Sequence, residues 1–396
     1  MHAKAQAVRI GAEVLWPMKT INFRMVFCVG LLLFFLRDLS PSIASAAHPD
    51  ATGSVLDQTD RFDWPALVMG VLGGLAIFLL GVERLTEAFS QVGDARIRTL
   101  IDRFTSNIWS AVLTGAVACT VLDSSSATII MVIAMIRGGL LTFEQSLGLV
   151  MGANIGTTIG AQIIALDVFG YAPLFLIIGL ALSMLKRTPR QKNIGIGLIG
   201  AGLIFFGLGH LEGSVSPLRN YQPFLEWVET LGSHPTLGAF AGCLATLVIQ
   251  SSSATVGIAI VMAKADLVSI RAGVAVMLGA EIGTVSNTLV ASVGRGREAI
   301  RCAVFHLFFN LTTVIVGLML IGPLIWLAEL FAPGAKNGGL HVARSIANAQ
   351  VIFNVLGVLA FIPLIPWIAR FLIWQIPNES RATDSTRASV GTDYQI

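Results

Sequence analysis

Long apolar runs separated by short polar segments dominate the chain between residues 65 and 373. A membrane-spanning helix needs roughly 20 predominantly apolar residues to cross the hydrocarbon core of a bilayer. The pattern predicts seven such helices, the last of them long enough to be tilted or broken. They are expected at residues 65–82, 147–166, 171–185, 194–208, 272–293, 302–321 and 342–373.

Two further apolar runs carry serine triplets. The run at 108–136 exceeds the length of one span and falls short of two, and Ser124–Ser126 lie in its middle. The run at 239–262 carries Ser251–Ser253. We expect each run to form a helical hairpin that enters the membrane and turns back at the serines. A single long tilted helix is the alternative for the first run.

The two serine triplets belong to a duplication. Asp123-Ser-Ser-Ser-Ala-Thr128 is followed by Gln250-Ser-Ser-Ser-Ala-Thr255, and Gly152-Ala-Asn-Ile-Gly-Thr157 by Gly279-Ala-Glu-Ile-Gly-Thr284. Both pairs of motifs share one offset of 127 residues (123 to 250, and 152 to 279). A shared offset indicates a repeated unit. Three predicted spans separate equivalent points, and because an odd number reverses direction, we predict an inverted repeat.

Composition and charge agree with this picture. Hydrophobic residues make up 55% of the chain and charged residues 12%, against about 25% charged residues in a soluble protein. We therefore predict an all-α integral membrane protein with two re-entrant hairpins. Basic residues concentrate at 84–103, 186–192 and 295–301, which places these loops and the C-terminal tail in the cytoplasm by the positive-inside rule.

Residues 1–47 are typical of a secretory signal peptide. Lys19 and Arg24 precede a short apolar run, and small residues follow it at 42–47. We expect cleavage near Ala46 or Ala47, with an uncleaved anchor as the alternative. The remaining organisation is a first repeat at 64–185, a second repeat at 193–325, a final helix at 342–376 and a cytoplasmic tail at 377–396.

Interrupted helices inside a membrane expose backbone groups that have lost their hydrogen-bond partners. Helix N-termini carry partial positive charge and attract anions, whereas free carbonyl groups attract cations. Two hairpins that meet at mid-membrane would place both kinds of group, together with serine hydroxyls, between the repeats. This arrangement is expected of a secondary transporter for a small, oxygen-rich ion.

Two late Phe-Asn motifs lie at 306–310 and 346–354. Together with the doubled serine and glycine motifs, they resemble the sodium/phosphate cotransporter family, over roughly residues 68–363. The resemblance implies sodium-coupled movement of inorganic phosphate across a bacterial cytoplasmic (inner) membrane, with sodium as coupling ion and no other cofactor. The candidate substrate- and ion-binding residues are Asp123, Ser124, Ser125, Ser126, Thr128, Asn154, Thr157, Thr158, Gln250, Ser251, Ser252, Ser253, Thr255, Glu281, Thr284, Asn310 and Asn354. The candidate sodium ligands are Asp123, Ser125, Gln250, Ser252 and Glu281.

Two positions depart from the family pattern. Asp123 stands where the family usually has Gln, and Glu281 where Asn is usual. A carboxylate inside the membrane is costly and usually functional. We hypothesise that one or both bind sodium or a proton; the alternative is that they face a water-filled vestibule. Gln350 stands where relatives often have His, and we assign it no ion role.

Other functions remain as alternatives. They are a carrier of another oxyanion, a proton-coupled phosphate exporter and an ion channel. The inverted duplication favours alternating access over a channel pore. An enzyme is disfavoured, because the serine triplets have no His or Lys at an identifiable partner position.

Overall fold

The computed structural model describes residues 63–103, 107–122, 124–166, 169–184, 188–332 and 338–377. The signal-peptide prediction, Asp123 and nearly all of the C-terminal tail fall outside these residues. The chain divides into two compact units, residues 1–68 and 69–396, and the second carries the features that follow. All regular elements of the described part are helices, which confirms the all-α class.

The α-helices fall into three groups. The first repeat holds α3 (Trp64–Arg103), α4 (Ile108–Leu122), α5 (Ser125–Arg137), α6 (Phe143–Ala165) and α7 (Ala172–Met184). The second holds α8 (Pro189–Val215), α9 (Gln222–Ser233), α10 (Pro235–Ile249), α11 (Ser252–Lys264), α12 (Ile270–Ser292), α13 (Arg297–Met319) and α14 (Ile321–Leu330). The last are α15 (Gly339–Phe361) and α16 (Ile365–Gln375).

Six helical segments in the described residues are long and apolar enough to cross a membrane, at 64–88, 143–165, 191–220, 270–292, 297–319 and 339–375. They coincide with six of the seven predicted spans. The remaining one, at 171–185, forms the 13-residue helix α7. The pair α9 and α10, bent by 108°, would count as a seventh span if it crosses as one unit. The last span is broken at Ile362–Leu364, where Pro363 cannot donate a backbone hydrogen bond.

The bounds of the helices repeat with the motifs. Helices α4, α5 and α6 reappear as α10, α11 and α12, with first and last residues all shifted by 127 (108 to 235, 125 to 252, 143 to 270). The turns before α6 and α12 also match. Each contains one left-handed residue, Gly139 (φ 69°) and Asp266 (φ 52°), and each following helix is capped by a hydroxyl, Thr142 and Ser269.

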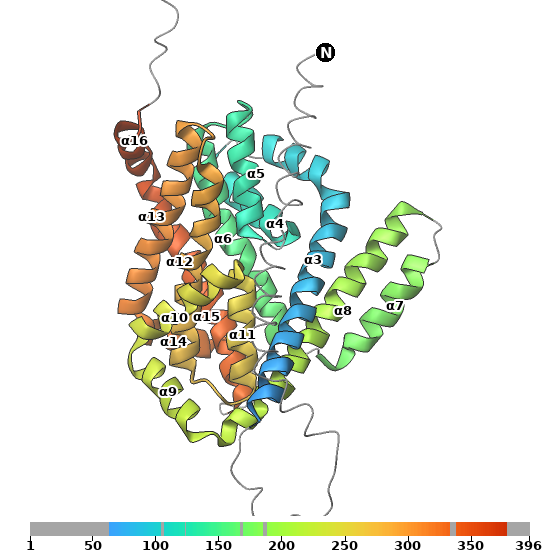
Figure 1. The fold of residues 1–396 in the computed structure, drawn as a ribbon. Coiled ribbons are helices and arrows are strands. Elements are labelled where there is room, and N and C mark those ends of the chain that lie inside the picture. Colours follow the sequence, from blue (N-terminus) through green and yellow to red (C-terminus); the bar gives the residue numbers. More distant parts are fainter. Residues whose placement is uncertain are drawn as a thin grey trace, which may run out of the picture. The chain divides into compact units, whose positions relative to one another are not determined.

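Close glycine contacts set the direction of α4 against α6. Gly148 leaves no room for a side chain beside Ile108, and Gly152 none beside Val112. Further along, Thr120 donates to the Gly156 carbonyl oxygen (3.3 Å). The contacts advance in the same direction, so α4 and α6 run parallel. Because α5 leads back to the start of α6, α4 and α5 form a hairpin whose tip lies beside the middle of α6 (Figure 1).

The second repeat is built in the same way. Gly238 packs against Ala275, and Gly283 against Thr246, so the contacts advance in the same direction and α10 and α12 run parallel. Helix α11 returns from the tip to the start of α12. Each hairpin also packs across the repeat boundary, with α5 against α12 and α11 against α6.

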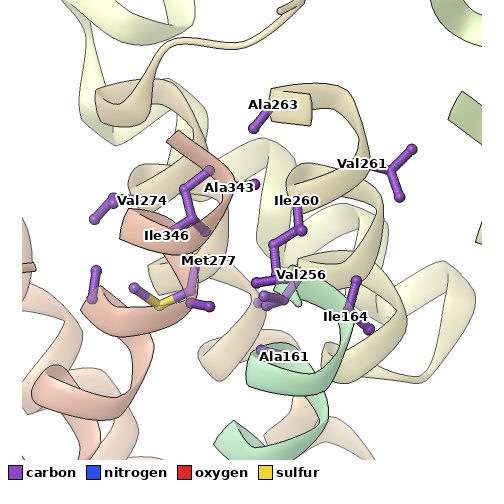
Figure 2. Packing of buried hydrophobic residues seen from close by; sticks show 14 of the residues in the cluster. Ala161, Ile164, Val256, Ile260, Val261, Ala263, Val274, Met277, Ala343 and Ile346 are labelled. Atoms are coloured by element: carbon purple, nitrogen blue, oxygen red, sulfur yellow. The ribbon is translucent and has the colours of Figure 1, made fainter. Parts of the chain in front are cut away.

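The core on the α11 side is apolar and tightly packed. Figure 2 shows Ile164 of α6 beside Val256 and Ile260 of α11, with Met277 of α12 and Ile346 of α15 in the same cluster. Gly257, one residue beyond Val256, would bring a Cβ within 3.2 Å of Ile164. Apolar packing therefore holds the second hairpin against the first repeat.

Candidate functional site

A serine caps the helix at each hairpin tip. The side chain of Ser124 accepts the N–H of Ala127 (3.1 Å), and that of Ser251 accepts the N–H of Ala254 (3.2 Å). Both capping residues have extended backbones, with φ of −158° and −147°. The other N–H groups of a first helical turn have no partner within the helix. Each tip therefore presents amide donors and hydroxyl groups at the positive end of a short helix.

One amide joins the two tips. Asn287 of α12 donates from Nδ2 towards Ser126 Oγ at the first tip (3.4 Å) and towards the carbonyl oxygen of Gln250 at the second (3.3 Å). Gln250 has a left-handed backbone (φ 59°) that ends α10. The position equivalent to Asn287 in the first repeat is Gly160. The two serine triplets thus lie within reach of one side chain.

A buried amide cluster lies at the glycine motif of α6. Asn154 Nδ2 donates to Asn310 Oδ1 of α13 (2.6 Å). Asn310 Nδ2 is 2.8 Å from the backbone oxygen of Glu281 and 3.2 Å from His306 Nε2. The other ring nitrogen of His306 lies 3.1 Å from Thr288 Oγ1. These bonds connect a motif of the first repeat to α12 and α13 of the second.

The equivalent position of α12 carries a carboxylate. Oε1 of Glu281 accepts from Gln350 Nε2 (3.0 Å) and from Asn354 Nδ2 (3.4 Å), both on α15. All three side chains are buried, and Glu281 is 3% exposed. Asn354 also donates to the Gln350 carbonyl oxygen (3.0 Å).

Several predicted site hydroxyls bond to their own helices. Thr128 and Thr255 donate to the backbone oxygens of Ser124 and Ser251, four residues earlier. The same type of bond is made by Thr157, Thr158 and Thr284. Their protons are used locally, so these oxygens could serve a ligand only as acceptors. Ser125 and Ser252 are buried in the first turns of α5 and α11, and Ser253 is half-buried.

Sequence reasoning assigned no site role to several polar residues that link different helices. Asn287 holds the two tips, and Gln162 Nε2 of α6 donates to Asn348 Oδ1 of α15 (3.1 Å). The available signal was an amide within a predicted span, alone at Gln162 and between Ser286 and Thr288 at Asn287, and it does not reveal a partner. Gln350 was assigned no ion role, yet it contacts Glu281 directly.

The Na+/Pi-cotransporter family model matches the chain twice, over residues 77–213 and 220–358. The chain belongs to this family. The two matches confirm both the resemblance and the duplication. The family is one of transporters rather than enzymes, and phosphate is its substrate.

Three relatives show the range of the similarity. "Uncharacterized protein YqeW" of Bacillus subtilis is 28% identical over 306 residues, which cover 76% of this chain and 96% of the relative. "Putative inorganic phosphate export protein YjbB" of Escherichia coli K12 is 24% identical over 77% of this chain. This alignment spans only 55% of that relative.

The human sodium-dependent phosphate transport protein 2B is 39% identical over 90 residues, which are 21% of this chain and 13% of the relative. No solved structure matches the chain.

Proposed function

We propose that this Na+/Pi-cotransporter family member is a secondary carrier that moves inorganic phosphate across the membrane, coupled to sodium. The observation that carries the proposal is the meeting of two serine-capped helix N-termini at Asn287. Helix N-termini bind phosphate through backbone N–H groups and the positive end of the helix dipole. Phosphate would lie between the tips of α5 and α11, with Ser125, Ser126, Ser252 and Ser253 as further donors.

The proposed carrier works by alternating access between inverted repeats. Two contacts support the inversion. The equivalent helices α3 and α8 run in opposite directions, since Gly74 packs on Gly207 and Leu211 whereas Gly81 packs on Gly200. The second contact is between Gly257 of α11 and Ile164 of α6. Gly257 lies on the way from the second tip to the base of its hairpin, and Ile164 lies beyond the part of α6 that faces the first tip, so the two hairpins extend in opposite directions from their tips. The hairpins would then enter from opposite faces and meet at mid-membrane.

A proton-coupled exporter is the second candidate. Two observations favour it: the YjbB relatives carry phosphate export in their name, and Glu281 places a buried ionisable group on α12, the helix that carries Asn287. The two candidates differ in the direction of phosphate flux and in the ion whose gradient drives it.

Labelled-phosphate flux in proteoliposomes, with sodium and proton gradients imposed separately, tests the proposal. We expect saturable phosphate uptake that a sodium gradient drives and that arsenate inhibits more strongly than sulfate. The double variant S125A/S252A should lower the flux about tenfold or more, because each tip loses a buried hydroxyl. The matched control S233A changes an exposed serine of α9 and should transport like the wild type. Absence of phosphate flux under either gradient contradicts the proposed substrate.

Asp123 provides a separate test of coupling. Replacing Asp123 by Asn removes a charge immediately before the first tip and restores the amide type found at Gln250. We expect the sodium dependence of phosphate flux or the ion stoichiometry to change while the fold is kept. Unaltered flux with unaltered sodium dependence would show that Asp123 takes no part in coupling.

A further inference from the structure

The glycine motif of each repeat belongs to a buried polar cluster, and the two clusters differ in charge. In the first, Asn154 of α6 contacts Asn310 of α13, which in turn lies 3.2 Å from His306 Nε2. In the second, Glu281 of α12 contacts Gln350 and Asn354 of α15. Asn154 and Glu281 occupy equivalent positions, and both partner pairs are spaced four residues apart. The second cluster therefore has a carboxylate where the first has an amide, and an amide where the first has an imidazole.

Within the described part of the chain, the carboxylate of Glu281 has no basic partner. Among the described residues, no lysine or arginine forms an ion pair with it. Two amides donate to Oε1, and the contact of Asn310 is to the backbone oxygen. A buried carboxylate that is neither protonated nor paired with a positive charge is strongly unfavourable. Two neutral donors on one oxygen do not supply that charge.

A second observation points to a ligand at the same place. Oε1 of Gln350 is buried and has no hydrogen-bond partner among the described residues. The Gln350 side chain already donates its Nε2 to Glu281 (3.0 Å), so its unpartnered acceptor belongs to the same cluster. A buried acceptor without a donor is costly. Carboxylate and amide oxygens are the ligands that hard cations prefer.

We propose that Glu281 of α12 and Gln350 of α15 form a binding site for one monovalent cation, sodium or a proton, which has no counterpart at Asn154 of the first repeat. A proton on the Glu281 carboxyl could be donated to Gln350 Oε1, and a sodium ion could be shared by both oxygens. Either cation neutralises the carboxylate and satisfies the free acceptor. The inference rests on the proposed function only for its role in coupling, because cation binding is measurable without phosphate.

One other titratable side chain is linked to the site by hydrogen bonds within the described residues. Of the titratable side chains on the helices that pack against α12, His306 alone is linked to Glu281 by hydrogen bonds in the described part of the chain, through Asn310. The buried Arg301 of α13 instead donates to the carbonyl oxygen of Ile376 (2.8 Å). A pH effect at this site therefore has two candidate groups, Glu281 and His306.

The test uses the full-length protein in nanodiscs without phosphate. Radioactive sodium binding is measured for the wild type, E281Q and Q350L, and infrared difference spectra report a protonated carboxyl group. If sodium is the ligand, E281Q abolishes one saturable sodium site and Q350L weakens it about tenfold. If a proton is the ligand, sodium binding is unchanged, and the wild type shows a protonated carboxyl band that E281Q lacks and Q350L shifts.

Two further variants keep the test decisive. E281N/Q350H gives the second cluster the residue types of the first, which the fold already accommodates, and should lose cation binding even if E281Q misfolds. E144Q makes the same chemical change at an exposed position of α6 and should behave like the wild type.

The site is disproved if E281Q and E281N/Q350H bind sodium like the wild type and no carboxyl band depends on residue 281. A cation site in a protein without phosphate flux would instead overturn the proposed function alone. His306→Gln separates the two titratable groups, because a carboxyl band assigned to Glu281 must survive that substitution.

Discussion

Asn287 holds the two hairpin tips through a single side chain. Its amide reaches Ser126 Oγ and the Gln250 carbonyl oxygen at 3.4 and 3.3 Å. The first repeat has Gly160 at the equivalent position, so this bridge has no repeat-related copy. Contacts of this length are weak individually, and their value lies in fixing the separation of two helix ends that would share one ligand.

Removing this amide should weaken phosphate transport more than stability. In N287A the tips lose both contacts, and we expect phosphate flux to fall about fivefold to tenfold, with a loss of about 1 kcal/mol in the free energy of unfolding. N220A, at an exposed residue, is the control. Flux and thermal unfolding of the two variants are compared in the same lipid. Equal flux in N287A and N220A would show that the bridge has no role in transport.

For single residues, the sequence predicts a role in the site where a motif is repeated, and it misses site residues that have no repeated counterpart. Ser124 and Ser251 stand out because the motif is doubled, and the structure places both as helix caps. Asn287 lies between Ser286 and Thr288, and its equivalent in the first repeat is Gly160, so the doubled motifs do not single it out. The contact between Glu281 and Gln350 joins residues 69 apart in the chain, and only the packing of α15 on α12 reveals it.

Short length defines the hairpin helices. α4 and α10 have 15 residues, and α5 and α11 have 13, whereas a full crossing takes about 20. The sequence predicts the break at each serine triplet, because serine is a strong N-cap residue. It predicts the start of the second hairpin less well. That hairpin begins at Pro235 rather than Ala239, since proline fits the first turn of a helix.

Glycine at the parallel helix contacts makes these elements sensitive to small substitutions. A Cβ at Gly152 would overlap the Val112 carbonyl oxygen, and one at Gly279 the Ala239 carbonyl oxygen. We expect G152A and G279A each to lower the free energy of unfolding by about 2 kcal/mol or more, because backbone atoms must move apart.

The matched control is G322A in α14, where a Cβ meets no atom within 4 Å. It should be neutral or slightly stabilising, since alanine is the better helix former. Thermal unfolding in detergent measures all three variants. If G152A is as stable as G322A, the close approach of α4 and α6 does not limit the fold.

For the whole molecule, the apolar pattern predicts the helical membrane class and the motif offset predicts the duplication, because both are local or repeated features. The relative direction of the repeats is harder to predict. It depends on counting spans, and α7 is too short to be counted by length alone. The antiparallel contacts of α3 and α8 support inversion independently of that count.

Inversion has a consequence that can be measured on intact cells. Glu144 and Arg271 are equivalent exposed residues in the first turns of α6 and α12, beside the bases of the two hairpins. In an inverted repeat they face opposite sides of the membrane. We therefore expect E144C to be protected from a membrane-impermeant maleimide outside the cell and R271C to be labelled, in a background with the native cysteines replaced by alanine. The unmodified background controls for non-specific labelling, and permeabilised cells should label both variants. Labelling of both cysteines from outside would place the two hairpins on one face, and the carrier would then need a different mechanism from alternating access between mirrored halves.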